Sequence, residues 1–83
     1  MCQHRQNLIQ EIIQELRIAV KHEFREPRRF VRLWANERTT MKYARDVHTE
    51  LRLALPALPA NSKVRAWYER LGALCRGEDP EIW

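Results

Sequence analysis

The sequence has few of the residues that carry chemistry in small proteins. It contains two glycines, two cysteines and three histidines, without a nucleotide-binding motif or a zinc-type spacing such as C-x₂-C or H-x₃-H. Cys2 and Cys75 are too few for a disulfide framework, and Cys2-x-His4 is a weak metal pair. No nucleophile has a base beside it, and pockets of several hundred cubic ångströms are hard to build in so small a core. We expect no enzyme activity, metal, cofactor or small-molecule substrate.

Long apolar runs are also missing. No stretch approaches the ~20 apolar residues of a membrane span, and Glu11, Glu15 and Arg17 interrupt the apolar residues near the N-terminus, which argues against a signal peptide. The same acidic residues disfavour binding of this segment to a membrane surface. Together with the low cysteine content, this predicts a cytoplasmic protein without membrane contact.

Apolar residues recur at spacings of three and four along most of the chain, which is typical of amphipathic helices. Pro27 and Pro56 interrupt the pattern, because proline cannot continue a helix and disfavours helix at the residue before it. We expect an all-α fold, a compact bundle of about four helices, with a radius of gyration of about 12 Å. The expected helices span residues 7–25, 28–36, 39–55 and 62–76.

The expected domain organisation is simple. Residues 1–76 form a single helical domain, and residues 77–83 form an acidic C-terminal tail that ends in Ile-Trp. Thr39 or Thr40, and Asn61 or Ser62, are the candidate N-caps of the last two helices, because a side-chain oxygen there accepts a hydrogen bond from an unpaired backbone N–H.

One stripe in the first helix suggests a homodimer. Ile9, Ile13, Leu16 and Val20 follow steps of four, three and four, which is the spacing of a coiled-coil seam. A chain of this length buries only about 60% of its unfolded surface, so a second copy would enlarge a thin core. Two heptads do not establish a coiled coil, and both a homodimer through residues 7–25 and burial within the domain stay open.

Basic residues gather in the first half of the chain. The whole sequence carries fifteen Lys and Arg against eleven Asp and Glu, a net charge of +4. Residues 17–45 alone hold nine basic and three acidic side chains, a net charge of +6. A surface with this charge favours an anionic partner.

The segment 38–55, when it is wound as a helix, places a basic stripe of Arg38, Lys42, Arg45 and Arg52 opposite an apolar stripe. Burial of the apolar side would hold the cations rigid, and guanidinium groups bind phosphate oxygens in two-point contacts. A solvated face whose charges pair with nearby acids is the alternative interpretation. The candidate contacts to nucleic acid or to an acidic partner are Arg28, Arg29, Arg32, Arg38, Thr39, Thr40, Lys42 and Arg45, with Arg17, Lys21 and Arg25 as a secondary basic stripe.

The middle of the chain also fits a helix-turn-helix. A short helix, a turn at residues 36–38 and a longer helix would bring Thr39, Thr40, Lys42 and Arg45 to base edges and phosphates. The turn has no glycine, and phosphate contact alone explains the basic face equally well.

Two functions follow from these features. The first is a small basic helical regulator that binds nucleic acid, DNA more than RNA, through residues 17–45. The second is a protein-protein interaction adaptor or inhibitor, whose basic face binds an acidic surface of a larger complex. In that second hypothesis Ile82 and Trp83 anchor the partner, because aromatic side chains are frequent hot spots of interfaces.

Overall fold

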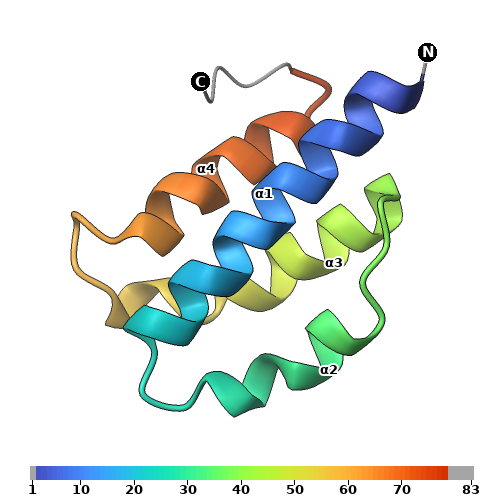
Figure 1. The fold of residues 1–83 in the computed structure, drawn as a ribbon. Coiled ribbons are helices and arrows are strands. Elements are labelled where there is room, and N and C mark those ends of the chain that lie inside the picture. The colour runs from blue at the N-terminus through green and yellow to red at the C-terminus, as the bar shows by residue number, and fades with distance from the viewer. Residues whose placement is uncertain (1, 79–83) are drawn as a thin grey trace.

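The computed structural model describes residues 2–78, with side chains from residue 4 onward. It contains four α-helices and two short 3₁₀ turns, and no strand occurs within these residues (Figure 1). The all-α fold predicted from the sequence is therefore confirmed, and the Cα radius of gyration is 12.0 Å. In chain order the elements are α1 (Cys2–Glu23), η1 (Pro27–Phe30), α2 (Val31–Ala35), α3 (Met41–Arg52), η2 (Leu55–Ala57) and α4 (Lys63–Cys75).

The element boundaries differ from the predicted ones where prolines tighten the chain. The segment predicted as one helix at 28–36 is a 3₁₀ turn that starts at Pro27, followed by the five-residue α2. The third helix ends at Arg52 instead of residue 55, because Pro56 disfavours the α conformation at the residue before it. The chain continues there through shorter turns, in which Ala54 N–H donates to the Leu51 carbonyl and Ala57 N–H donates to the Ala54 carbonyl. The first helix begins at Cys2, five residues earlier than predicted.

Side-chain caps begin the last two helices. The Thr40 hydroxyl accepts a hydrogen bond from the Tyr43 N–H at 3.2 Å, and the Ser62 hydroxyl accepts one from the Arg65 N–H at 3.3 Å. Thr40 and Ser62 are each one of the two residues predicted as candidate N-caps of these helices. At the other end of α4, Gly77 adopts a positive φ of 87°, a conformation that glycine reaches without the strain of a Cβ atom.

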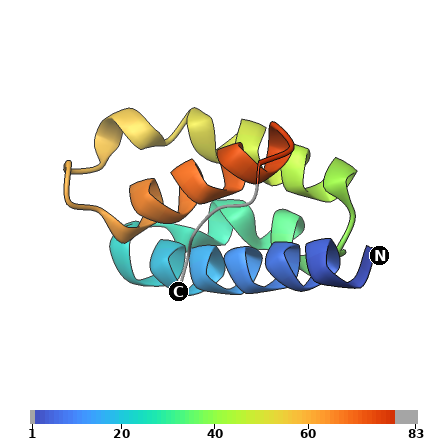
Figure 2. The same ribbon diagram turned by 90° about the horizontal axis from the view of Figure 1, so that it is seen from above.

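The core lies between α1, α4 and α3. Helix α1 packs mainly against α4, and α4 packs against α3; Figure 2 shows α1 along one edge of the molecule with the other two helices beside it. The candidate dimer stripe of Ile9, Ile13, Leu16 and Val20 is buried within the single chain. These side chains therefore belong to the core, and a homodimer through this helix would have to use its outer face.

Polar contacts fix the connection between α2 and α3 and the connection between α3 and α4. The Tyr43 hydroxyl donates to the Leu33 carbonyl at 2.8 Å, which joins α3 to α2. The Arg65 guanidinium donates to the carbonyls of Leu55, at 2.6 Å, and Leu58, at 2.9 Å, and so holds the proline-rich connector against α4. Arg65 thus has a structural role inside the fold and is not available as a surface cation.

Candidate nucleic-acid interface

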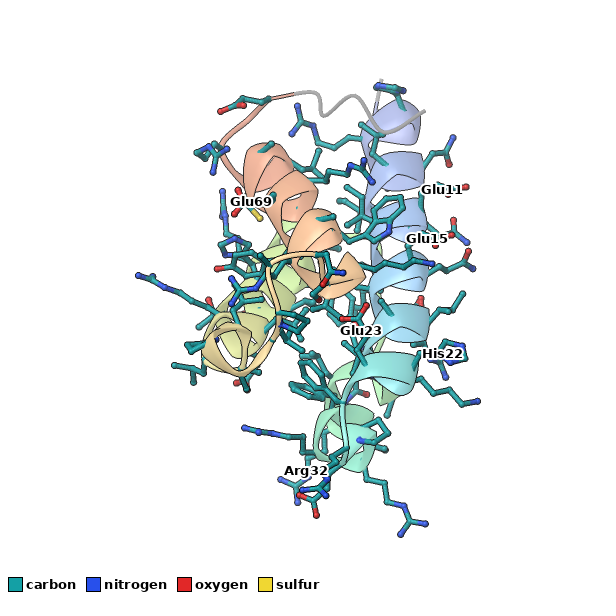
Figure 3. The ribbon with its side chains drawn as sticks, turned by 90° about the vertical axis from the view of Figure 1, so that its left-hand side faces the viewer. Glu11, Glu15, His22, Glu23, Arg32 and Glu69 are labelled. Carbon is teal, nitrogen blue, oxygen red and sulfur yellow. The ribbon has the colours of Figure 1, made fainter. Side chains whose placement is uncertain are left out.

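Four arginines surround the turn between α1 and α2. Proline at the start of η1 turns the chain sharply after α1, and this turn spreads the side chains over the end of the molecule, where Figure 3 labels Arg32. All four side chains are exposed, and none of them forms an ion pair with another described residue. We call this cluster the basic bend; it consists of Arg25, Arg28, Arg29 and Arg32.

The backbone of the basic bend is fixed by aromatic packing. Phe30 is buried, and its ring lies 5.1 Å from the ring of Phe24, centroid to centroid. The guanidinium of Arg29 lies 5.3 Å from the centre of the Phe30 ring, a cation–π geometry. The cations therefore extend from a backbone that the core holds in place.

Helix α3 carries cations and anions on its outer surface. Lys42 and Arg45 are exposed as predicted, but Asp46 and Glu50 are exposed as well. Asp46 lines a small hollow together with Arg38 and Lys42. Glu50 lines another hollow with Arg29 and Arg32 of the basic bend. These acids reduce the positive potential on the side of α3 that faces the bend.

The predicted basic surface is divided into two parts. One part consists of the basic bend together with Arg38 and Lys42 near the start of α3. Arg45 lies on the α4 side, near enough for its charge to act on the Cys75 thiol. Arg52 lies on that side too, where its charge and that of Arg76 act on the His48 imidazole. A helical wheel places all of the α3 cations in one stripe, because it shows one helix alone and takes no account of the helices packed against it.

The secondary basic stripe on α1 is partly neutralised. The Arg17 guanidinium lies 3.7 Å from a carboxylate oxygen of Glu37 in the turn before α3, and such exposed pairs contribute about 0.2–1 kcal/mol. Lys21 is exposed and forms no ion pair with a described residue. Of this stripe, Lys21 and Arg25 are therefore available to extend the basic bend.

Thr39 and Thr40, which the sequence predicts at base edges, have different environments. The Thr40 oxygen accepts the capping hydrogen bond from Tyr43, which leaves the hydroxyl proton for a ligand. Thr39 is partly buried. The short helix, five-residue turn and longer helix of residues 27–52 keep the order of a helix-turn-helix, and its docking in a DNA groove stays a prediction.

A ring stack between α3 and α4 was not foreseen from the sequence. The His48 and Tyr68 rings stack with centroids 4.1 Å apart and planes 12° from parallel. A Cβ atom at Gly72 would lie 2.9 Å from His48 Nε2, so glycine permits this close approach of the helices. Burial, and then the charges of Arg52 and Arg76, lower the pKa of His48. Neither the ring pair nor its charged neighbours can be found without the register of α3 on α4.

Cys75 is a partly buried free cysteine. Burial raises the pKa of the Cys75 thiol, which keeps it protonated and unreactive. Within the described side chains, no group of three or more His, Cys, Asp or Glu residues is arranged to hold a metal ion. The candidate partner anchors Ile82 and Trp83 lie outside the described residues.

None of the helices described between residues 2 and 78 combines the length and the apolar character required to cross a bilayer. Comparison of the chain with protein-family models, with curated proteins and with solved structures gave no match. Function must therefore be inferred from the geometry and charge of the chain itself.

Proposed function

We propose that the chain is a small regulator that binds nucleic acid through its basic bend, with Lys21, Arg38 and Lys42 at the edges of the contact surface. The ligand is a phosphate backbone, and DNA is preferred to RNA. The function is binding, without catalysis.

Four neighbouring cations without a paired anion support this function. An isolated exposed arginine is common on any protein, but four within eight residues repel one another unless an anionic ligand neutralises them. Each guanidinium presents several N–H donors in a planar fork that matches two phosphate oxygens. The packing of Phe24 and Phe30 holds the backbone of the bend in place, so binding does not have to order it.

An acidic protein surface is the alternative ligand for the same cations. Nucleic acid is favoured here because the bend offers several adjacent charges, and a phosphate backbone repeats its charge at regular spacing. The two ligands differ in the salt dependence of binding, since nucleic acid releases condensed counterions as each phosphate is neutralised.

The test is fluorescence anisotropy with labelled random duplex DNA, single-stranded DNA and RNA at two salt concentrations. We expect micromolar or tighter binding to duplex DNA that weakens steeply with salt. The triple variant Arg28→Glu/Arg29→Glu/Arg32→Glu should abolish binding, and Lys42→Glu, at the edge of the contact surface, should weaken it.

The matched control is Arg5→Glu/Arg70→Glu/Arg76→Glu, which changes the net charge by the same amount away from the bend. It should retain most of the affinity, and circular dichroism of each variant establishes that the helices are intact. An equal loss in both triple variants would mean that net charge alone drives binding. Absence of binding by the unmodified protein at low salt would refute the proposal.

A further inference from the structure

A cleft of about 480 Å³ opens beside the basic bend. It lies between the end of α1 and the connector that follows α3, and its size is within the range of sites that bind ligands. Its floor is mostly apolar, with Phe24, Leu53, Ala54, Pro56, Ala57 and Leu58 among the lining residues.

Leu53 is the most exposed large hydrophobic residue of the cleft lining. Its side chain is 75% exposed, more than that of any other large hydrophobic residue described. Pro56 and Ala57 beside it are exposed too, and Phe24 is only half-buried. Single exposed leucines are normal, but a concave group of apolar side chains left in water is typical of a binding site.

The charged lining defines the kind of ligand. Arg25 and Arg29 line the cleft without an ion pair among the described residues. Glu26 also lines it, whereas the carboxylate of Glu23 accepts hydrogen bonds from the Ser62 hydroxyl and the Lys63 N–H at the start of α4. The lining thus holds two arginines and two glutamates, and Arg28 and Arg32 beside it give the surroundings a net positive charge. Two clefts placed face to face would therefore repel each other, and the ligand should be acidic and carry bulky apolar side chains.

One segment of this chain has that chemistry. Residues 78–83 read Glu-Asp-Pro-Glu-Ile-Trp, with three carboxylates, no cation and two large apolar side chains. The Glu78 carboxylate pairs with Arg76 at 3.0 Å, so Asp79 and Glu81 supply the charges for a cationic cleft. We propose that the cleft binds this segment from a second copy of the chain, with Ile82 and Trp83 on the apolar floor and the carboxylates near Arg25 and Arg29. This protein ligand is additional to nucleic acid, and the proposal does not depend on the function proposed above.

The dimensions of the chain favour a second copy over the same molecule. The Glu78 N–H donates to the Ala73 carbonyl, at the end of α4 that lies away from the end of α1 and from the connector after α3 (Figure 1). Ten residues of helix separate Ala73 from Lys63, about 15 Å at 1.5 Å per residue, and the cleft lies beyond Lys63. The four residues from Glu78 to Ile82 span at most about 14 Å. Even a fully extended chain from Glu78 therefore does not bring the Cα atom of residue 82 to the cleft of the same molecule.

Binding of this kind joins copies head to tail. The contact uses a different surface on each copy, so it extends to a third and fourth copy unless the ring closes. Since Arg25 and Arg29 belong to both surfaces, an occupied cleft should compete with nucleic acid at the basic bend.

The experiment measures anisotropy of a labelled peptide with the sequence of residues 76–83 against the full chain, and sedimentation of the full chain at rising concentration. We expect micromolar peptide binding and a larger species at high concentration. Leu53→Glu should reduce both at least tenfold. Ile18→Glu, at a residue 53% exposed on α1, is the matched control and should leave both unchanged. Replacement of Ile82 and Trp83 by serine in the peptide should abolish its binding.

Three results would overturn the proposal: no peptide binding, equal binding by Leu53→Glu and the unmodified protein, or peptide binding that appears only after residues 79–83 are deleted. The last result would indicate that the chain fills its own cleft. Thermal unfolding establishes that Leu53→Glu is folded. The neutral variant Leu53→Ser separates the two proposals, because it adds no charge beside Arg25 and Arg29: it should lose peptide binding and still bind nucleic acid.

Discussion

The carboxylate of Glu23, the last residue of α1, accepts a hydrogen bond at 2.9 Å from the backbone N–H of Lys63, the first residue of α4. Its second oxygen accepts a hydrogen bond from the hydroxyl of Ser62. One carboxylate thus caps the N-terminus of α4, where negative charge is favourable, and joins two helices that are far apart in sequence. Figure 3 shows Glu23 directed toward the start of α4.

Replacement of Glu23 should therefore destabilise the whole fold. We expect Glu23→Ala to lower the free energy of unfolding by about 1–3 kcal/mol, because it leaves polar groups of the cap without their partner. Glu23→Gln should cost less, since the amide oxygen still accepts one hydrogen bond. Urea denaturation measures both, with the exposed Glu26→Gln as control. A Glu23→Ala variant as stable as the control would show that the cap contributes nothing.

The two tyrosines should ionise late in alkaline solution. Burial, and then the nearby charge of Glu37, raise the pKa of Tyr43 to about 12, and burial raises that of Tyr68 as well. In the unfolded chain a tyrosine ionises near pH 10. The unfolded state therefore loses its proton first, and Tyr43 stabilises the fold fully below pH 10 and progressively less from pH 10 to about 12, at about 1.4 kcal/mol per pH unit.

Absorbance at 295 nm follows this titration. Tyr43→Phe should remove the step near pH 12, whereas Tyr68→Phe should keep it. Tyr43→Phe should also lower the stability at neutral pH by about 0.5–1.5 kcal/mol, because the Leu33 carbonyl loses its donor. A step near pH 12 that survives in Tyr43→Phe would contradict the assignment.

Features that depend on short-range chemistry were predicted well. The apolar stripe of α1 is buried as its periodicity indicated, and Thr40 and Ser62 cap α3 and α4 because a cap needs only the hydroxyl and the next turn of backbone. Arg28, Arg29 and Arg32 of the basic bend were grouped from the sequence because they are neighbours in it, whereas Arg25 was assigned to the secondary stripe; their role in binding stays a prediction.

Features that depend on tertiary packing were missed. Glu23 binds a residue 40 positions away, and no local pattern indicates that contact. The same holds for the stack of His48 on Tyr68 and for the division of the α3 cations. A helical wheel gives the direction of Arg45 and Glu50 from the axis, but the neighbouring helices decide that one lies toward α4 and the other near Arg32.

The close approach of Gly72 to His48 should show in stability. Alanine at a helical glycine contributes up to about 1 kcal/mol from backbone propensity, but here its Cβ would push against the imidazole. We expect Gly72→Ala to give little or no gain in the unmodified protein, and about 0.5–1 kcal/mol in a His48→Ala background. A double-mutant cycle from urea denaturation measures this coupling. Equal gains in both backgrounds would mean that the ring shifts without cost.

The acids on α3 should weaken nucleic-acid binding if the basic bend is the contact surface. Glu50 shares a hollow with Arg29 and Arg32, so its carboxylate competes with a phosphate for the same guanidinium groups. Glu50→Gln should increase the affinity for duplex DNA about 1.4- to 5-fold, which corresponds to the 0.2–1 kcal/mol of an exposed charge pair. Salt should reduce this gain, since screening weakens the interaction of exposed charges.

The control is Glu69→Gln, which removes the same charge from α4, away from Arg32 (Figure 3). It should change the affinity much less, because beyond a Debye length of about 8 Å at physiological salt the carboxylate is largely screened from the bend. Anisotropy titrations of the two variants side by side measure the difference. An equal gain from both would mean that the DNA responds to net charge, and the contact would then not be localised at the basic bend.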